Sequence, residues 1–237
     1  MTDKIALVFG GSRGIGAACV AALAADGYDV AFTYVSNPPQ GETLGRSYKV
    51  EITEAAEVAK VFADVKADFG AAPSVVVANA GINVPPAPLA QFDAANFRRL
   101  IEVNFVGAFN ILQEAARQVA DNGAIIALTT SLVRVAAPGL GPYSATKAAV
   151  ECLVRSLSKE LAGRGVRVNA VAPGPVDTDL FRAGKDEAAL ARSAAMSPFN
   201  RVGRPEEVAE VVRFLASARR PGCMARSSSP MAGWSSR

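Results

Sequence analysis

Residues 5–16 read Ile-Ala-Leu-Val-Phe-Gly-Gly-Ser-Arg-Gly-Ile-Gly, an apolar run followed at once by a glycine-rich turn. The run 5–9 has the composition of a strand buried on both faces, and residues 15–25 have the pattern of a helix. Glycines between a strand and a helix let the backbone approach a pyrophosphate, and the helix N-terminus offers N–H groups to that anion. The alternative is an ordinary turn without a ligand. The stretch therefore predicts a dinucleotide site whose contacts come from Gly10, Ser12, Arg13, Gly14, Ile15 and Gly16.

The rest of the chain alternates short apolar runs with longer helical patterns. This alternation predicts an α/β fold, a single Rossmann-type domain with a doubly wound parallel sheet and helices on both faces. The domain is expected to span residues 1–216 of the 237. Further strands are predicted at 30–34, 47–50, 75–78, 124–129 and 166–171, and further helices at 55–69, 94–119, 144–161 and 206–216.

Composition excludes several kinds of chemistry. The sequence has no histidine, so acid–base chemistry has to use Tyr, Lys, Asp, Glu or Cys. Cys19, Cys152 and Cys223 lack metal-ligand spacing, and no metal is predicted. A net charge of +3 without a basic cluster before the tail predicts no nucleic-acid partner. With no signal peptide and no apolar stretch of membrane-spanning length, a cytoplasmic protein without membrane contact is expected.

The end of the second predicted strand bears on which dinucleotide binds. An acidic residue there would bind the ribose 2′-OH of NAD, whereas a cation nearby would suit a 2′-phosphate. The stretch 33–37 contains no acid, and Arg13 in the glycine turn offers a guanidinium group. The alternative for Arg13 is a solvated loop charge. NADP(H) is therefore favoured over NAD(H), with Tyr34, Ser36 and Asn37 as further cofactor-binding candidates.

Tyr143 and Lys147 stand four residues apart at the start of a helical pattern, which places them on one helix face. A free phenol has a pKa of about 10, and a nearby ammonium group stabilises the phenolate and lowers that pKa. A phenol tuned in this way can exchange a proton with a carbinol oxygen. By itself the spacing is common on surface helices. In combination with the glycine turn, the pair predicts an acid–base site.

These residues together resemble the classical short-chain dehydrogenase/reductase family, in particular its 3-oxoacyl-acyl-carrier-protein reductases. The resemblance runs from about Lys4 to Ala216. It implies an NADP(H)-dependent oxidoreductase that moves a hydride between the nicotinamide and a small carbonyl or alcohol substrate of the ketone or 3-oxoacyl type. The alternative is a non-catalytic NADP(H)-binding sensor or scaffold. Further stretches that carry the resemblance are Asn79-Ala80-Gly81, Asn104, Ser131, Pro173-Gly174-Pro175-Val176, Thr178 and residues 203–209.

The resemblance also implies roles for single residues. Tyr143 would be the acid/base, Lys147 would lower its pKa and hold the nicotinamide ribose, and Ser131 would bind the substrate oxygen. Asn104 would distort its helix and hold a water that leads to Lys147. Cofactor contacts are implied for Glu51, Ile52, Asn79, Ala80, Gly81, Tyr143, Lys147, Pro173, Gly174, Val176 and Thr178.

Two departures from the family pattern affect the site. The family usually has Thr before the first loop glycine, where this chain has Phe9, so a hydroxyl that stabilises the turn is lost. Ser131 lies twelve residues before Tyr143, whereas thirteen is common, and Thr130 stands at thirteen. Ser131 is preferred because one inserted or deleted loop residue restores its position, and Thr130 stays a competitor.

Residues 177–201 follow the sixth predicted strand. Ligands bind beyond the carboxyl ends of strands in open α/β sheets, so this segment is expected to form a lid over an apolar substrate. A surface helical hairpin without a gating role is the alternative.

Residues 217–237 differ in composition from the rest, being rich in Arg, Ser, Pro and Gly without a strand signal. The family normally ends in a final strand, so a missing or altered last strand and a disordered tail are expected. A reading-frame shift near Ser217 would explain this composition, and a naturally divergent tail is the alternative. The resemblance further implies a homo-oligomer, a tetramer or a dimer, which such a tail would weaken.

Overall fold

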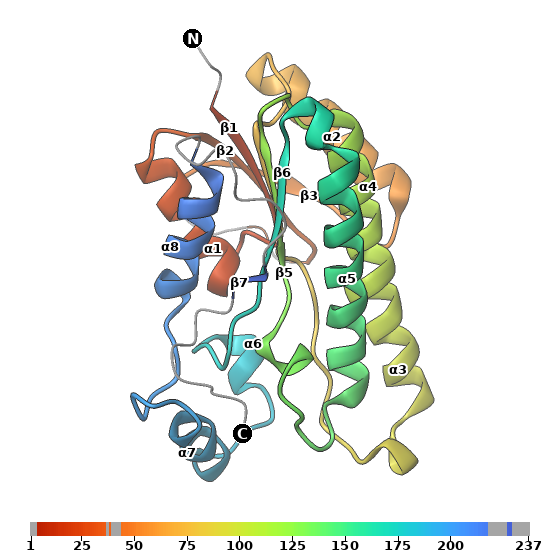
Figure 1. Ribbon diagram of the computed structural model, residues 1–237, viewed down its shortest axis with the longest axis vertical. Coiled ribbons are helices and arrows are strands. Elements are labelled where there is room, and N and C mark those ends of the chain that lie inside the picture. Colours follow the sequence, from red (N-terminus) through yellow and green to blue (C-terminus); the bar gives the residue numbers. More distant parts are fainter. Residues whose placement is uncertain (1–3, 37, 39–43, 218–226, 229–237) are drawn as a thin grey trace.

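The computed structural model describes residues 4–36, 38, 44–217 and 227–228, and these form a parallel sheet between two layers of helices (Figure 1). The strand order is β3-β2-β1-β4-β5-β6-β7, and every pairing is parallel. The chain winds outward from β1 in both directions, which places the switch point between β1 and β4. The predicted doubly wound fold is confirmed.

The elements follow one another in the predicted alternation. The strands are β1 (Ile5–Phe9), β2 (Asp29–Tyr34), β3 (Arg46–Lys49), β4 (Val75–Ala78), β5 (Ala124–Leu128), β6 (Arg167–Val171) and β7 (Ser227–Ser228). The α-helices are α1 (Gly14–Ala25), α2 (Ala55–Phe69), α3 (Ala94–Leu100), α4 (Ala108–Gln118), α5 (Gly141–Glu160), α6 (Asp179–Arg182), α7 (Glu187–Ala195) and α8 (Pro205–Ala216). Short 3-10 turns are η1 (Leu89–Gln91), η3 (Ser131–Val133) and η4 (Ala162–Arg164), and η2 (Ile101–Gly107) is a π-helix.

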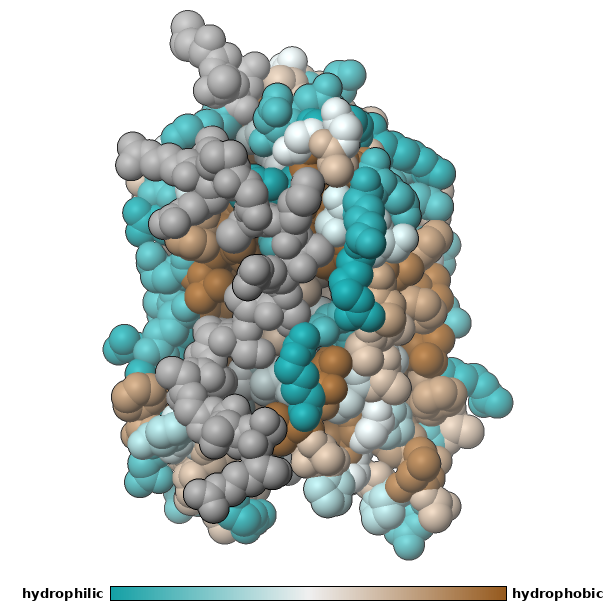
Figure 2. Space-filling view, viewed as in Figure 1, coloured by the Kyte–Doolittle hydropathy of each residue, from teal (hydrophilic) through white to brown (hydrophobic). Residues whose placement is uncertain are grey.

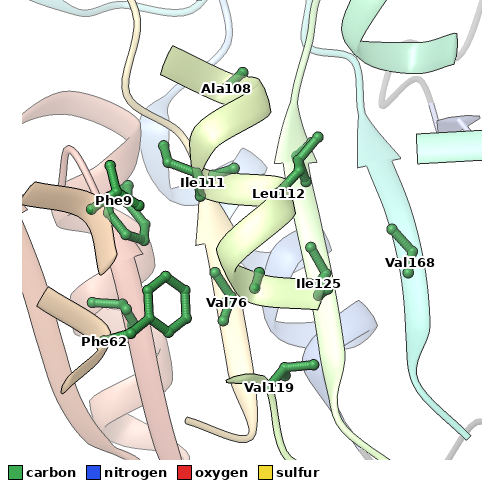
Figure 3. Close-up of a cluster of buried hydrophobic side chains, with 14 of the residues drawn as sticks. Phe9, Phe62, Val76, Ala108, Ile111, Leu112, Val119, Ile125 and Val168 are labelled. Carbon is green, nitrogen blue, oxygen red and sulfur yellow. The ribbon is translucent and has the colours of Figure 1, made fainter. Parts of the chain in front are cut away.

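Successive side chains of a strand point to opposite faces of the sheet, so the core consists of two clusters, one on each face. Helices α2, α4 and α5 cover one face of the sheet, and α1 and α8 cover the other (Figure 1). Phe9 points to the first face, where its ring centroid lies 5.8 Å from that of Phe62. Figure 3 shows both rings together with Ile111 in the space between the sheet and the helices. Burial on both faces explains why β1 and β4 are apolar at every position.

The predicted helix over residues 94–119 is interrupted. Between α3 and α4 the π-helix η2 carries Asn104, which is fully buried. Single π turns inside α-helices occur mostly at functional sites. This one contains Asn104, the residue at which the family resemblance implies a distorted helix.

The last strand is altered, in agreement with the expectation of a missing or altered strand: it has two residues. Ser227–Ser228 forms β7, which pairs in parallel with Ala170 and Val171 at the edge of β6. Backbone pairing needs no apolar side chain, so the serines gave no strand signal. The expectations for 218–226 and 229–237 lie outside the described residues.

The outer surface of the α3–α4 layer carries apolar side chains. Phe97 and Phe109 are 44% and 42% exposed, and Figure 2 shows apolar patches on this flank of the molecule. Across the described ranges, helices are too short or too polar to cross a bilayer.

Candidate active site

The glycine turn is folded back tightly on the start of α1. Gly10 and Gly14 have φ values of 74° and 55°, in the left-handed region that favours glycine. A Cβ added at Gly16 would overlap the Gly10 carbonyl oxygen and lie 2.7 Å from Asn79 Nδ2. The position of Gly16 therefore has no room for a side chain, because the start of α1 packs directly against the turn.

Side chains from neighbouring strands hold the turn in place. The N–H of Gly10 donates a hydrogen bond to Thr33 Oγ1 at 3.0 Å, and Asn79 Nδ2 donates to the Gly10 carbonyl at 2.9 Å. Thr33 thus supplies a hydroxyl to this turn, although Phe9 stands where the family usually has Thr. The expected loss of a stabilising hydroxyl is offset by a residue on β2.

The N-terminus of α1 fits an anionic group. Its N-cap is Arg13, which makes no side-chain cap hydrogen bond, and its first turn contains no acidic residue. These features leave the positive end of the helix dipole without a carboxylate. A Cβ on Gly14 would meet Thr178 Cγ2 at 3.2 Å, so the loop after β6 reaches the same place. The glycine cradle and the uncapped helix end fit a dinucleotide pyrophosphate.

The structure describes most of the residues that are expected to surround the adenosine end of a cofactor. Tyr34 is half-buried at the end of β2, Ser36 and Arg13 are exposed, and Asn37 lies outside the described residues. After β3, the Glu51 carboxylate accepts a hydrogen bond from the Thr53 N–H at 3.4 Å.

Ile52 belongs to the core. It is 2% exposed, and a Cβ on Gly107 would lie 2.7 Å from its side chain. Its carbonyl accepts a hydrogen bond from Asn110 Nδ2 at 2.9 Å. The Ile52 side chain therefore fills core space beside η2, and the cofactor contact expected of Ile52 stays a prediction.

Tyr143 and Lys147 occupy the first two turns of α5. Tyr143 is half-buried, whereas Lys147 is 6% exposed and its Nζ donates a hydrogen bond to the Leu128 carbonyl at 3.1 Å. The Thr146 hydroxyl donates to the Tyr143 carbonyl at 2.7 Å. The helix thus fixes the backbone of Tyr143 while the end of β5 fixes the amine of Lys147.

Asn104 joins this cluster from the π-helix. Its Oδ1 accepts a hydrogen bond from the Ile82 N–H at 2.8 Å, and its Nδ2 donates to the Ile82 carbonyl at 2.9 Å. A Cβ on Gly81 would meet Asn104 Oδ1 at 3.0 Å and Lys147 Nζ at 3.3 Å. The π turn therefore brings a buried amide against the chain after β4, beside the lysine.

Burial shifts the pKa values of the acid–base pair in opposite directions. Desolvation raises the pKa of Tyr143 to about 12 and lowers the pKa of Lys147 to about 8. Desolvation of the phenolate is the cause that acts on Tyr143 in the chain alone. Tyr143 therefore keeps its proton at neutral pH. The expectation that Lys147 lowers the pKa of Tyr143 stays a prediction.

The two candidate hydroxyls after β5 have different surroundings. Thr130 is 7% exposed, and its Oγ1 accepts a hydrogen bond from the Leu132 N–H at 3.3 Å, which caps η3. Ser131 is half-buried, and its N–H donates to the Pro173 carbonyl at 2.9 Å. The arrangement favours Ser131, because the Thr130 hydroxyl already serves the backbone.

The loop after β6 leads into the expected lid. Pro173, Gly174 and Val176 line a pocket of about 210 Å³, whose other walls include Phe199 from the 177–201 segment. Gly203 closes the base of that segment, because its carbonyl accepts the Asp177 N–H at 2.8 Å. Two helices, α6 and α7, lie between these ends.

Known proteins share this architecture. A family model described as enoyl-(acyl carrier protein) reductase matches residues 10–227. A short-chain type dehydrogenase/reductase from Picea abies is 38% identical over 90% of this chain and 86% of its own. The chain belongs to the short-chain dehydrogenase/reductase family.

Other relatives of the chain are named for different activities. A chloroplastic NADPH-dependent aldehyde reductase-like protein of Arabidopsis thaliana is 36% identical, covering 91% of this chain and 88% of its own. A 3-oxoacyl-[acyl-carrier-protein] reductase of Staphylococcus aureus is 36% identical, covering 90% and 91%. A Burkholderia cenocepacia short-chain dehydrogenase in complex with NADP has a TM-score of 0.83 at 29% identity over 97% of both chains. The predicted family is confirmed.

Sequence reasoning missed four polar side chains beside the site of this dehydrogenase/reductase. Thr33 bonds the glycine turn, and Glu151 joins Thr129 to Arg134 around the candidate serine. One signal was available, since Glu151 stands four residues after Lys147 on the stripe that begins with Tyr143.

Proposed function

We propose that this chain is an NADP(H)-dependent reductase of a small ketone or 3-oxoacyl-type carbonyl compound, with Tyr143 as the proton donor. The observation that carries the proposal is the pairing of a half-buried phenol with a buried lysine amine one turn further along α5. Burial of a charged amine costs folding free energy, and buried titratable groups of this kind cluster at functional sites. Membership of an oxidoreductase family supports the same conclusion.

NADP(H) is the proposed cofactor. The supporting features are the exposed guanidinium of Arg13 and the absence of an acid in the stretch 33–36 at the end of β2. The Arabidopsis relative named for NADPH and the Burkholderia structure with NADP agree with this choice. The glycine turn, residues 79–81 and the loop 173–178 would hold the dinucleotide, and the bound nicotinamide would supply a hydride to the carbonyl carbon.

The side chains of this site have separate proposed tasks. Tyr143, protonated because its pKa is raised to about 12, donates its proton to the oxygen of the reduced carbonyl. Lys147, still charged below its pKa of about 8, stabilises the phenolate that remains. Ser131 orients the substrate oxygen, and Asn104 holds the chain beside Lys147. A phenol that must be protonated before the step favours reduction over oxidation.

The lid, the oligomeric state and the location of the protein are also proposals. Residues 177–201 would close over the substrate, because this segment follows β6 and ligands of open α/β sheets bind beyond the carboxyl ends of the strands. A homo-oligomer and a cytoplasmic location also stay predictions.

The test compares the rates at which NADPH and NADH are oxidised in the presence of ketones, 3-oxoacyl thioesters and quinones. It is made with the parent protein and with the variant Tyr143→Phe. Turnover should fall by about 100-fold or more while NADPH binding is retained, because one hydroxyl supplies the proton. Tyr48→Phe is the control, because Tyr48 lies on β3 and its hydroxyl donates its hydrogen bond to Asp68, which is not a residue of the proposed site. Full turnover by Tyr143→Phe would exclude the proposed role, and NADPH binding by a parent protein without turnover would indicate a sensor.

A further inference from the structure

Helix α5 presents a third polar side chain on the stripe that begins with Tyr143 and Lys147. Glu151 follows at the next interval of four residues, and its side chain is 3% exposed. The proposed proton transfer gives it no task. A carboxylate this deeply buried requires partners that satisfy its charge.

The partners of Glu151 come from the segment after β5. Arg134 donates to both carboxylate oxygens, from Nη1 to Oε1 at 3.2 Å and from Nη2 to Oε2 at 3.1 Å. The Thr129 hydroxyl lies 3.0 Å from Oε1. A two-point pair between a guanidinium and a carboxylate fixes direction as well as distance. Glu151 therefore defines where both residues stand relative to α5.

Thr129 precedes the candidate Ser131 in the sequence, and Arg134 follows it. The Ser131 carbonyl accepts the Arg134 N–H at 2.9 Å, so the arginine is joined to the serine through the backbone of η3. On the other side, the Ser131 N–H donates to Pro173. Both ends of the segment 129–134 are thus attached to the helix that carries the phenol.

We propose that Glu151 is a positioning residue, which acts through Arg134 and Thr129 to hold the Ser131 hydroxyl in register with the Tyr143 phenol. The inference rests on the proposed function. Two hydroxyls that grip one carbonyl oxygen have to keep a fixed separation, and a displacement of about 1 Å is enough to slow a reaction about 100-fold. The bidentate pair supplies a rigid link between their two elements.

The test uses Glu151→Gln, with Arg134→Ala and the double variant. Glu151→Gln keeps the shape of the side chain, and Arg134 is 47% exposed, so water can solvate the released guanidinium. We expect kcat/KM for the carbonyl substrate to fall by about 10-fold to 100-fold, mainly through kcat, with an unchanged Kd for NADPH. The double variant should be no slower than the slower single variant, because both changes break one link.

Glu160→Gln is the matched control, because Glu160 is exposed on the same helix and bonds the Ser156 hydroxyl at 2.8 Å. It should keep the kcat/KM of the parent. A Glu151→Gln variant with the parent's kcat/KM would overturn the inference. Losses of NADPH affinity and thermal stability as large as the loss of kcat/KM would overturn it as well. If Tyr143→Phe is inactive while Glu151→Gln is fully active, this inference fails and the proposed function stands. A parent without carbonyl turnover overturns both.

Discussion

The glycine turn and the buried face of α5 lie at the same end of the sheet but depend on opposite properties. At Gly16 the turn requires the absence of a side chain, since a Cβ would overlap a carbonyl oxygen. The face of α5 requires side chains whose polar atoms are buried: Lys147 and Glu151 are 6% and 3% exposed, and Asn104, which η2 brings beside them, is 0% exposed. The first region is therefore sensitive to added atoms, and the second to the loss of a charge or a hydrogen bond.

Residues 79–81 connect the two regions. Asn79 bonds the carbonyl of Gly10, whereas Gly81 lies where a Cβ would meet both Asn104 and Lys147. Three consecutive residues after β4 therefore contact both regions. The variants below separate the contribution of space from that of buried charge.

The largest effect is expected for Gly16→Ala. The added methyl group would overlap the Gly10 carbonyl oxygen and press on Asn79 Nδ2, so the turn has to open. We expect the free energy of unfolding to fall by about 3 kcal/mol or more, with loss of NADPH binding. Urea unfolding and a fluorescence titration with NADPH measure the two losses.

The control for this variant is Gly163→Ala. A Cβ at Gly163 meets no described atom within 4 Å, and its φ is not positive. It should leave stability and binding at parent values. If both glycine variants behave alike, crowding at the turn is not what makes Gly16 necessary.

A smaller effect of opposite sign is expected for Lys147→Met. Burial lowers the pKa of this lysine from 10.5 to about 8, so below pH 8 the folded chain holds an unfavourable buried charge. Methionine removes it, and the free energy of unfolding at pH 7 should rise by about 1–3 kcal/mol. Reductase turnover should be lost, because the phenolate of Tyr143 loses its stabilising ammonium group.

The pH dependence of stability checks the cause. The unfolded lysine stays protonated above pH 8 while the folded one releases its proton, so stability of the parent should rise between about pH 8 and pH 10. Denaturation midpoints across this range should lose the rise in Lys147→Met and retain it in Lys159→Met, an exposed lysine of the same helix. A rise that persists in Lys147→Met would assign it to another group.

Most of the fold follows from local sequence, whereas the site depends on contacts between distant segments. The run 5–9 is bounded by charge and glycine, and the structure reproduces β1 at those residues. The π turn was not predictable from periodicity, because it depends on Asn104 pairing with Ile82, which is 22 residues away. The two serines of β7 carry no apolar pattern, and their pairing is set by the edge of β6.

The pKa of Tyr143 shows a related difference between what spacing indicates and what packing decides. The spacing of four residues indicates that Lys147 shares a helix face with the phenol, but it gives no measure of burial. Burial dominates at both groups. Two residues can therefore be correctly placed from sequence while their protonation depends on what the rest of the chain packs around them.

The smallest expected effect concerns the link between β2 and the glycine turn. Thr33 is 1% exposed, and its hydroxyl accepts the Gly10 N–H at 3.0 Å. Thr33→Val keeps the shape and leaves that N–H without an acceptor, so the free energy of unfolding should fall by about 1–2 kcal/mol. Thr33→Ser keeps the hydroxyl and should retain the parent's Kd for NADPH, whereas Thr33→Val should weaken binding a few-fold because the turn loosens. If valine binds NADPH as well as serine does, the hydroxyl of β2 does not compensate for Phe9, and the turn is held by its close packing and by Asn79.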